Sequence, residues 1–199
     1  MSEVLIVPTG GANLASLVDA FGRLGAACEI SADPAAYARA ERIVLPGVGA
    51  APEARRRLAA AGLVECLRAE RRPVLGICLG MQLLFDASEE GDVAGLGVLP
   101  GRVERIAASP GVSVPHMGWC RVAPRRPSRL LDDDGGWFYF VHSFAAPPQG
   151  DTVAVVEHGA PFAAVVERPP FFGVQFHPER SSAAGAALLA RFLELPPCC

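Results

Sequence analysis

A cysteine held between two glycines is the side chain in this sequence best suited to act as a nucleophile. Gly76-Ile77-Cys78-Leu79-Gly80 has the form G-x-C-x-G and lies between a strand-like and a helix-like stretch. This pattern is the thiol counterpart of the nucleophile elbow, where flanking glycines let the strand and helix backbones approach each other. The turn would present the sulfur above a sheet, and the helix N-terminus would favour a thiolate and offer N–H groups to an oxyanion. On this motif alone, a buried structural cysteine remains the alternative.

A histidine and a glutamate two residues apart could supply the groups that such a cysteine needs. The segment His177-Pro178-Glu179 is expected to be extended, so its two polar side chains would point the same way. The carboxylate can then fix the imidazole tautomer while the imidazole takes the thiol proton. Taken alone, this segment could equally be a surface histidine near a carboxylate. Together with the elbow it predicts a thiol hydrolase with Cys78 as nucleophile, His177 as base and Glu179 as orienting group.

The first half of the chain must position the elbow, and it alternates short apolar runs with amphipathic segments. Such alternation predicts a parallel sheet covered by helices on both faces. The expected strands are residues 4–7, 28–30, 42–45 and 74–77. The expected helices are residues 14–24 with Asn13 as cap, a segment after the cap Asp33, residues 52–71 divided at Gly62, and residues 79–85.

The second half is richer in strands, turns and prolines. The expected strands are residues 103–106, 112–114, 137–141, 153–156, 163–166 and 172–174. A last helix over 181–193 would bury Ala184, Ala187, Leu188 and Phe192 on one face. We therefore expect one domain over residues 1–199, a three-layer α/β/α fold with a mixed, mainly parallel central sheet and antiparallel strands in the C-terminal half. Ligand sites in such sheets lie at the carboxyl ends of the strands, where Cys78 falls.

Composition excludes several classes of function. The chain has 199 residues and a net charge of −3, so no basic surface calls for nucleic acid. No apolar run approaches the ~18 residues of a membrane span, and no signal peptide precedes the first strand, so we expect a cytoplasmic protein without membrane contact. The six cysteines form no CxxC pair and the four histidines are scattered, so we expect no metal site.

Two longer segments around the predicted triad carry a family resemblance. Val74-Leu75-Gly76-Ile77-Cys78-Leu79-Gly80-Met81-Gln82-Leu83-Leu84 and Gly173-Val174-Gln175-Phe176-His177-Pro178-Glu179 resemble the class I (triad) glutamine amidotransferases. The resemblance spans the chain and its two motifs are highly specific. It implies hydrolysis of L-glutamine to glutamate and ammonia through a γ-glutamyl thioester on Cys78, with no metal or organic cofactor.

The same resemblance implies roles for residues around the nucleophile. It makes the Leu79 N–H one oxyanion donor and the backbone around Val48 and Gly49 the second, and leaves open whether a peptide there must first rearrange. It implies that Gln82, one helical turn after Cys78, binds the α-substituents of the substrate. It also places backbone groups along the glutamine pocket, from Gly47, His142, Ser143 and Phe144.

Three further segments resemble the glutaminase subunits of imidazole glycerol phosphate synthases, which act in histidine biosynthesis. They are Pro46-Gly47-Val48-Gly49-Ala50, Pro115-His116-Met117-Gly118-Trp119 and Tyr139-Phe140-Val141-His142-Ser143-Phe144. Ser88-Glu89-Glu90-Gly91 fits as well. This resemblance implies a heterodimer in which ammonia passes to a (β/α)₈-barrel cyclase that binds the nucleotide substrate. It also implies partner contacts at Asn13, Met117 and Trp119, the last two at an expected turn.

The chain departs from that pattern at two positions, and other functions remain open. Cys120 stands where asparagine is usual, which puts one partner contact or loop hydrogen bond in doubt, and Phe144 stands where tyrosine is common. The rivals are the glutaminase subunit of another synthase such as anthranilate synthase, a catalytically silent regulatory subunit, and a free-standing hydrolase of γ-glutamyl compounds. The PGVGA and PHMGW segments weigh against the first, the intact triad residues weigh against the second, and the third predicts strong activity without a partner.

Overall fold

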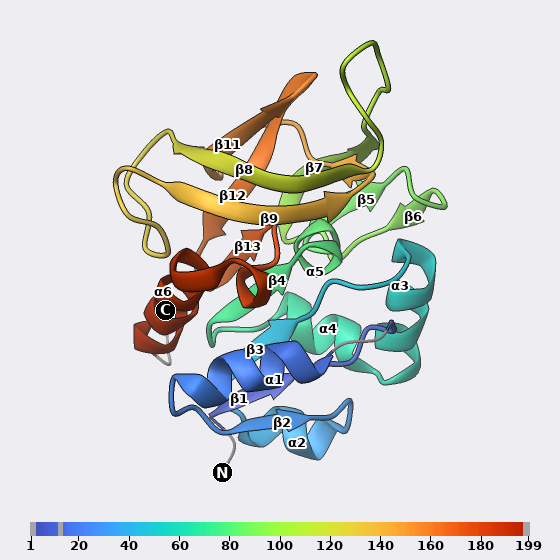
Figure 1. Ribbon diagram of the computed structural model, residues 1–199. Helices are drawn as coiled ribbons and strands as arrows, with labels where there is room; N and C mark the ends of the chain where they lie inside the picture. Colours follow the sequence, from blue (N-terminus) through green and yellow to red (C-terminus); the bar gives the residue numbers. More distant parts are fainter. Residues whose placement is uncertain (1–2, 12–13, 197–199) are drawn as a thin grey trace.

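The computed structural model describes residues 3–11 and 14–196, and a nine-stranded mixed sheet runs through its centre (Figure 1). The strand order is β2-β1-β3-β4-β13-β12-β11-β8-β9. Neighbours from β2 to β13 pair in parallel and neighbours from β13 to β9 pair antiparallel. The strands are β1 Val4–Ile6, β2 Cys28–Ile30, β3 Arg42–Leu45, β4 Val74–Ile77, β8 His116–Pro124, β9 Gly136–His142, β11 Thr152–His158, β12 Ala160–Arg168 and β13 Phe171–Val174. The mixed sheet is confirmed, although its parallel part is only as large as its antiparallel part.

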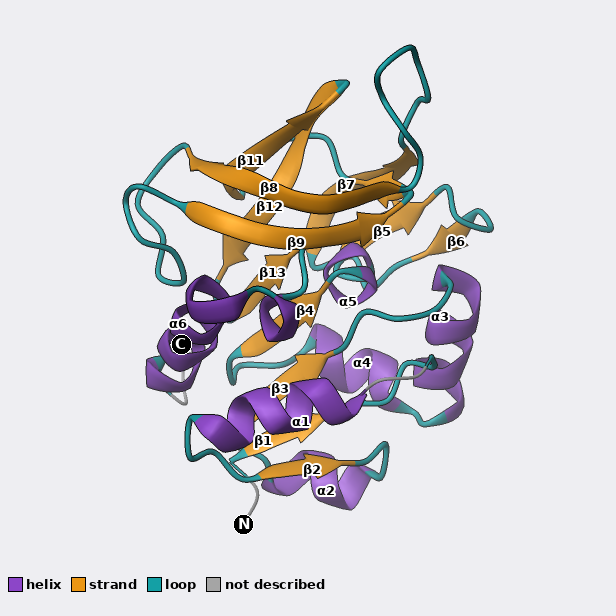
Figure 2. Cartoon of the chain, in the orientation of Figure 1, coloured by secondary structure: helices purple, strands orange, loops and turns teal. Residues whose placement is uncertain are grey.

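Helices cover both faces of this sheet, so the expected three layers are present (Figure 2). One core lies under α1 and α6, and the other under α2, α3, α4 and α5. Apolar strands with two buried faces separate these cores, as the continuous runs in β1, β3 and β4 predict. The helices are α1 Leu14–Arg23, α2 Pro34–Arg39, α3 Ala51–Ala60, α4 Leu63–Arg68, α5 Leu79–Gln82 and α6 Ser182–Glu194.

Two of the predicted helix boundaries are confirmed. Asp33 caps α2 by accepting a hydrogen bond from the Ala35 N–H at 2.8 Å. Gly62 separates α3 from α4 and adopts a φ of +70°, which favours glycine. The predicted cap Asn13 lies outside the described residues.

The helix expected over residues 79–85 is much shorter than predicted. It ends at Gln82 because the next carbonyls bond elsewhere: Leu83 O accepts from Leu96 N–H, and Leu84 O accepts from Val98 and Leu99 N–H. Phe85 then opens a second, four-stranded sheet of order β10-β7-β5-β6, which the sequence did not predict. Its strands are β5 Phe85–Ser88, β6 Val93–Ala94, β7 Leu99–Arg105 and β10 Phe144–Ala145.

Two predictions in the second half are wrong. Residues 112–114 form no strand, because a tight turn at Gly111 (φ +84°) leaves only an isolated bridge between Ser109 and Val112. The expected turn at Met117 and Trp119 is instead part of β8, whose residues alternate in direction along the strand and pair with β9.

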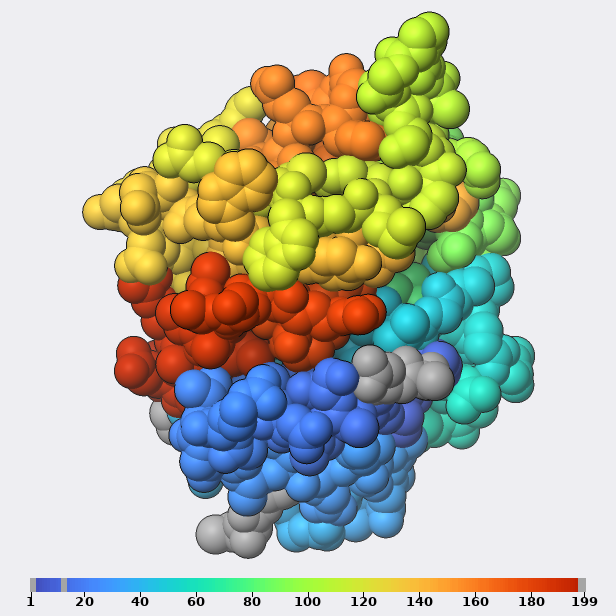
Figure 3. Space-filling model, viewed as in Figure 1, coloured from blue at the N-terminus to red at the C-terminus, as the bar shows by residue number. Residues whose placement is uncertain are grey.

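The last helix lies between α1 and the β8–β9 pair on the face shown in Figure 3. Its buried residues include Leu188 and Phe192 as predicted, and Phe192 packs against Phe21 of α1 with ring centroids 6.5 Å apart. Ala187 is exposed, contrary to prediction, while Gly185 and Leu189 complete the buried stripe. Among residues 3–11 and 14–196, no helix is both long and apolar enough to cross a membrane.

Candidate active site

Cys78 lies at the turn between β4 and α5, at the carboxyl end of a central strand. Its backbone adopts the unusual pair φ 50° and ψ −106°, which points the chain sharply from strand into helix. A Cβ on Gly76 would stand 2.6 Å from the Gly80 carbonyl oxygen, and one on Gly80 would stand 1.9 Å from the Leu45 oxygen. The glycines of the motif are therefore required by close backbone approach, as in a nucleophile elbow.

His177 and Glu179 lie beside this turn, in the segment that follows β13, the strand that pairs with β4. The His177 backbone is extended and Glu179 lies in a short 3₁₀ turn over Pro178–Arg180, so proline bends the segment instead of keeping it straight. The two side chains still meet: His177 Nδ1 lies 2.9 Å from Glu179 Oε1. Because a carboxylate accepts, Nδ1 carries the proton, and the other ring nitrogen is left for the sulfur.

The electrostatic environment of His177 favours the imidazolium. Burial by itself would lower the pKa of this imidazole, but its hydrogen bonds with Cys78 and with Glu179 outweigh burial and raise the pKa to about 10. The side chain of His177 is thus arranged to hold a proton next to the Cys78 sulfur at neutral pH.

A buried glutamine that the sequence analysis did not single out also faces the sulfur. Gln175 is fully buried and its Nε2 lies 3.6 Å from Cys78 Sγ, within range for an N–H···S hydrogen bond. Its Oε1 accepts a hydrogen bond from Gln82 Nε2 at 3.1 Å. An N–H group aimed at sulfur stabilises negative charge there.

Gln82 is 5% exposed and reaches two acceptors with one amide group. Its Nε2 donates to the Phe144 carbonyl at 2.7 Å and to Gln175. Both amide hydrogens are then committed, so what Gln82 can offer a bound molecule is its Oε1 acceptor. Gln82 N–H bonds to the Cys78 carbonyl at 3.1 Å, as the predicted spacing of one helical turn requires.

The loop of residues 46–49 lies against the nucleophile turn. A Cβ on Gly47 would stand 2.6 Å from the Cys78 Cβ, so this loop is in contact with the nucleophile turn. Thr9 Oγ1 donates to the Pro46 carbonyl at 3.0 Å, and Gly11 lies against the Val48 carbonyl, which fixes the loop from the β1 side. Gly49 has a φ of +126°, a conformation that favours glycine.

A cavity of about 370 Å³ opens over the sulfur and is large enough for a small amino acid. It brings together the predicted residues Cys78, His177, Glu179, Leu79, Gln82, Gly47, Val48, Gly49, His142, Ser143 and Phe144. It also contains Glu90, Arg105, Val141 and Arg180, whose presence in the cavity the sequence analysis did not foresee. Glu90 belongs to a segment quoted for its resemblance, but nothing in its spacing indicates that it would face the nucleophile.

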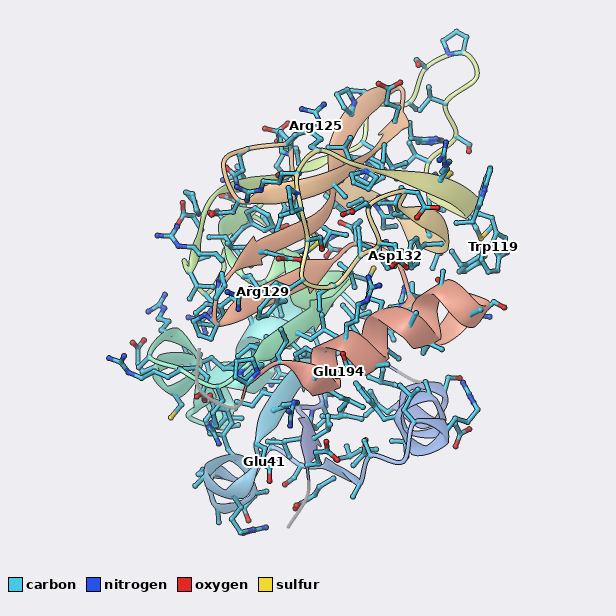
Figure 4. All side chains as sticks on the ribbon, turned by 90° about the vertical axis from the view of Figure 1, so that its left-hand side faces the viewer. Glu41, Trp119, Arg125, Arg129, Asp132 and Glu194 are labelled. Atoms are coloured by element: carbon cyan, nitrogen blue, oxygen red, sulfur yellow. The ribbon has the colours of Figure 1, made fainter. Side chains whose placement is uncertain are left out.

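Two predicted partner residues lie outside the cavity. Met117 and Trp119 are on the outward face of β8, 63% and 48% exposed, and Figure 4 shows Trp119 at the edge of the molecule, directed away from the ribbon. Asn13 is outside the described residues. Within the described part of the chain, no three His, Cys, Asp or Glu side chains are placed to hold a metal ion.

A thiol on a strand-to-helix turn, paired with a histidine held by glutamate, is the arrangement expected of the family to which the resemblance pointed. The sequence matches the family Glutamine amidotransferase class-I over residues 5–195, and the chain belongs to that family. More particularly, it is 51% identical over 197 residues, 98% of each chain, to the imidazole glycerol phosphate synthase subunit HisH of Xanthomonas euvesicatoria pv. vesicatoria (strain 85-10). It is 50% identical, with the same coverage, to HisH of Xylella fastidiosa (strain Temecula1 / ATCC 700964).

Solved structures agree on the fold. A crystal structure of a glutamine amidotransferase superposes with a TM-score of 0.75 at 18% identity, covering 97% of this chain and 98% of that one. PurLQS from Thermotoga maritima superposes with a TM-score of 0.72 at 19% identity, covering 98% and 99%. At these identities the superpositions establish the architecture only.

Proposed function

We propose that this chain is the glutaminase subunit of an imidazole glycerol phosphate synthase, and that it hydrolyses L-glutamine and passes the ammonia to a cyclase subunit. The observation that carries the proposal is the 51% identity to a HisH subunit over 98% of both chains, together with an intact Cys78–His177–Glu179 arrangement facing a cavity. We further propose that residues 1–199 act as one domain, in the cytoplasm.

The first half of the reaction is acyl transfer to sulfur. His177 holds the proton of Cys78, and the thiolate attacks the carboxamide carbon of glutamine to form a C–S bond and an oxyanion. When the oxyanion collapses, the C–N bond breaks and the nitrogen takes the proton from His177. Ammonia leaves, and a γ-glutamyl thioester remains on Cys78.

The second half is hydrolysis of the thioester. A water molecule gives its proton to His177 as its oxygen bonds to the acyl carbon. The C–S bond then breaks, and the sulfur leaves with the electron pair as thiolate. Glutamate is released and the thiolate–imidazolium pair is restored, while Glu179 keeps Nδ1 protonated through both halves.

Two groups of donors support the proposed oxyanion site. The first N–H groups of a helix have no partner within the helix, and Leu79 is the first residue of α5, next to the sulfur. Val48 and Gly49 line the same cavity, and we propose that a backbone N–H of this pair is the second donor. Loss of one such donor typically costs about 3 kcal/mol of barrier.

The cavity also contains groups suited to the amino-acid end of glutamine. The Gln82 Oε1 and the Glu90 carboxylate can accept from an α-ammonium group, and the Arg105 guanidinium can pair with an α-carboxylate. Gly47, His142, Ser143 and Phe144 also line the cavity, and we propose that their backbone groups bind this end of the substrate.

The partner that we propose is a (β/α)₈-barrel cyclase docked on the outward face of the β8–β9 pair. Met117, Trp119 and Trp137 are large apolar side chains exposed on these two strands. Val141 of β9 lines the cavity, so this face continues to the active site. Exposed Met and Trp are typical anchors of protein interfaces.

The decisive experiment is to co-purify the chain with its cyclase and to measure glutamate release with and without the nucleotide substrate of the cyclase. We expect slow hydrolysis by the isolated chain and fast hydrolysis by the complex with nucleotide. Full activity of the isolated chain would favour a free-standing hydrolase, and no activity in the complex would favour a silent regulatory subunit. Activation by an anthranilate synthase component instead would identify another synthase.

A further inference from the structure

A continuous line of hydrogen bonds joins the β8 strand to the Cys78 sulfur. It begins at Cys120, whose Sγ lies 3.1 Å from His116 Nε2, and continues from His116 Nδ1 to His142 Nε2 at 3.1 Å. His142 Nδ1 lies 2.9 Å from the Phe144 carbonyl oxygen. From that carbonyl the line passes through Gln82 and Gln175 to the nucleophile, at 2.7, 3.1 and 3.6 Å.

The Phe144 carbonyl fixes the direction of every bond on the histidine side. A carbonyl oxygen only accepts, so His142 Nδ1 carries its proton and, in a neutral ring, Nε2 is an acceptor. His116 must then donate from Nδ1, which leaves its Nε2 to accept from the Cys120 thiol. Both imidazoles are thereby held as neutral Nδ1–H tautomers.

The same carbonyl fixes the two amides on the other side. Gln82 must present Nε2 to Phe144, and its second hydrogen goes to Gln175. Gln175 must present Oε1 to that hydrogen, so its own Nε2 faces the sulfur. Turning over the Gln175 amide would bring two N–H groups together and aim an oxygen at Cys78, which makes the reversed orientation unfavourable.

Burial keeps the two imidazoles of this line neutral. His116, His142, Gln82 and Gln175 are all buried. Burial lowers the pKa of His116 to about 4, with the neighbouring His158 contributing, and burial lowers the pKa of His142 to about 3. Burial also raises the pKa of the Cys120 thiol, so the thiol keeps the hydrogen that it donates.

We propose that Cys120, His116 and Gln175 are positioning residues for the glutaminase reaction: Cys120 and His116 hold the His142 ring against the Phe144 carbonyl, and this carbonyl aligns Gln82 and Gln175 toward the substrate and the sulfur. The inference rests on the proposed function. It also accounts for Cys120 at a position where asparagine is usual in the pattern that this chain resembles, since both side chains can donate a hydrogen bond to His116 Nε2.

Paired variants at Cys120 separate a positioning role from simple packing. Cys120→Ala removes the donor to His116 Nε2, so the His116 ring loses one of the two hydrogen bonds that hold it in place beside His142. Cys120→Asn keeps a donor at that point. We expect about a threefold to tenfold fall in kcat/KM for glutamine in Cys120→Ala, the usual size for one neutral hydrogen bond, and recovery in Cys120→Asn. Cys66→Ala, at an exposed cysteine in α4, is the matched control.

Gln175→Leu tests the other end of the line. It removes the N–H aimed at the sulfur while keeping the side-chain volume close. We expect kcat to fall about tenfold with little change in KM. Because a buried substitution can unfold the chain, far-ultraviolet circular dichroism and thermal melting accompany the kinetics.

Two readouts do not depend on glutamine turnover. The ¹⁵N chemical shifts of the imidazole nitrogens report the tautomers directly, and we expect Nδ1–H at both His116 and His142 in the wild type and a mixture of Nδ1–H and Nε2–H at His116 in Cys120→Ala, where the ring is no longer held from both sides. Mass spectrometry of the Cys78 peptide after brief iodoacetamide treatment reports the reactivity of the sulfur, which should fall in Gln175→Leu. A Nε2–H tautomer at His142 in the wild type, or unchanged kcat/KM in Cys120→Ala, would overturn the inference. If the wild-type complex fails to hydrolyse glutamine, the proposed function fails, while the tautomers and the alkylation rates still test the hydrogen-bonded line.

Discussion

Glu179 Oε1 lies 2.9 Å from His177 Nδ1, and the two residues reach each other across a single proline. The contact is largely buried, with side-chain exposures of 7% for His177 and 11% for Glu179. Burial alone would lower the pKa of the imidazole, so the raised pKa of about 10 depends on Cys78 and Glu179 as partners. The carboxylate therefore both orients the ring and keeps a proton on it.

Replacing Glu179 with glutamine should weaken both effects. A histidine whose pKa is raised in the folded protein keeps its proton at neutral pH and loses it as pH rises through that pKa. In Glu179→Gln the pKa of His177 should fall, so the alkaline limit of kcat moves to lower pH, and kcat should fall on the order of tenfold to a hundredfold. A pH profile of glutamate release by the complex measures both quantities. An alkaline limit that stays in place would contradict this role of Glu179.

Cys78→Ala should abolish glutamine hydrolysis and leave the fold and the partner complex intact. The change removes only the sulfur from a buried turn whose geometry depends on Gly76 and Gly80. Glutamate release should fall at least about a thousandfold, as expected when a covalent nucleophile is lost. Size-exclusion chromatography with the cyclase checks that the complex still forms. Substantial residual turnover would mean that Cys78 is not the nucleophile.

The two motifs of the predicted triad could be read from the sequence because each is local, whereas the approach of Cys78 and His177 depends on the pairing of β4 with β13. Cys78 depends on glycines two residues away on either side, and Glu179 is two residues from His177. Gln175 and Glu90 could not be assigned in this way. Their places depend on which strands become neighbours, and no spacing within one segment encodes that.

The order of elements was predictable for the parallel half of the sheet, where continuous apolar runs alternate with capped amphipathic segments. The four-stranded sheet β10-β7-β5-β6 was not predictable. Its first strand, β5, follows α5 after only two residues, and the apolar residues of residues 79–85, which span both elements, also fit a longer helix. Only the bonds from the 96–99 segment to the Leu83 and Leu84 carbonyls end that helix early. A turn was expected at Met117 and Trp119, but the long pairing of β8 with β9 keeps this segment extended.

Gly47 should tolerate no side chain. A Cβ at this position would lie 1.9 Å from the Ile77 carbonyl oxygen and 2.6 Å from the Cys78 Cβ, so either the loop or the nucleophile turn must move. We expect Gly47→Ala to lower glutaminase activity at least about a hundredfold, the scale expected for misplacing a reacting group by roughly 1 Å. Gly22→Ala, in α1 with nothing within 4 Å of the added Cβ, is the control. It should leave activity unchanged and raise the free energy of unfolding by about 0.5–1 kcal/mol. Equal activity of the two variants would contradict the close approach.

Glu70 should contribute to stability in a pH-dependent way. Burial raises the pKa of this carboxyl, but hydrogen bonds from the Arg72 guanidinium, the Tyr37 hydroxyl and two backbone N–H groups outweigh it and lower the pKa to about 2. A carboxyl with a lowered pKa stabilises the fold above its unfolded value of 4.5, and this contribution disappears as pH falls toward 2.

Glu70→Gln should therefore lower the free energy of unfolding at pH 7 by about 1–3 kcal/mol, because buried donors lose a charged acceptor. The difference from the wild type should shrink as pH is lowered from 4.5. Urea denaturation at pH 7 and at pH 3.5 measures it. Glu65→Gln, at an exposed ion pair with Arg68, should change stability little at either pH. A deficit in Glu70→Gln that is independent of pH would exclude the carboxylate as its cause.

Trp119→Ala should weaken the complex with the cyclase much more than it destabilises the chain. Trp119 is half exposed on β8 and contacts Tyr139 of β9 edge to face, so its removal exposes little core. If Trp119 anchors the partner, the Kd should rise at least about tenfold, as is usual for a buried interface tryptophan, while the melting temperature changes little. Ile30→Ala is the matched control, because Ile30 is similarly exposed but lies on β2, at the opposite end of the sheet from β9. Isothermal titration calorimetry gives the Kd and thermal melting gives the stability. Equal affinities of the Trp119→Ala and Ile30→Ala variants would mean that the partner does not bind the β8–β9 face. A partner would then have to act on Cys78 by another route.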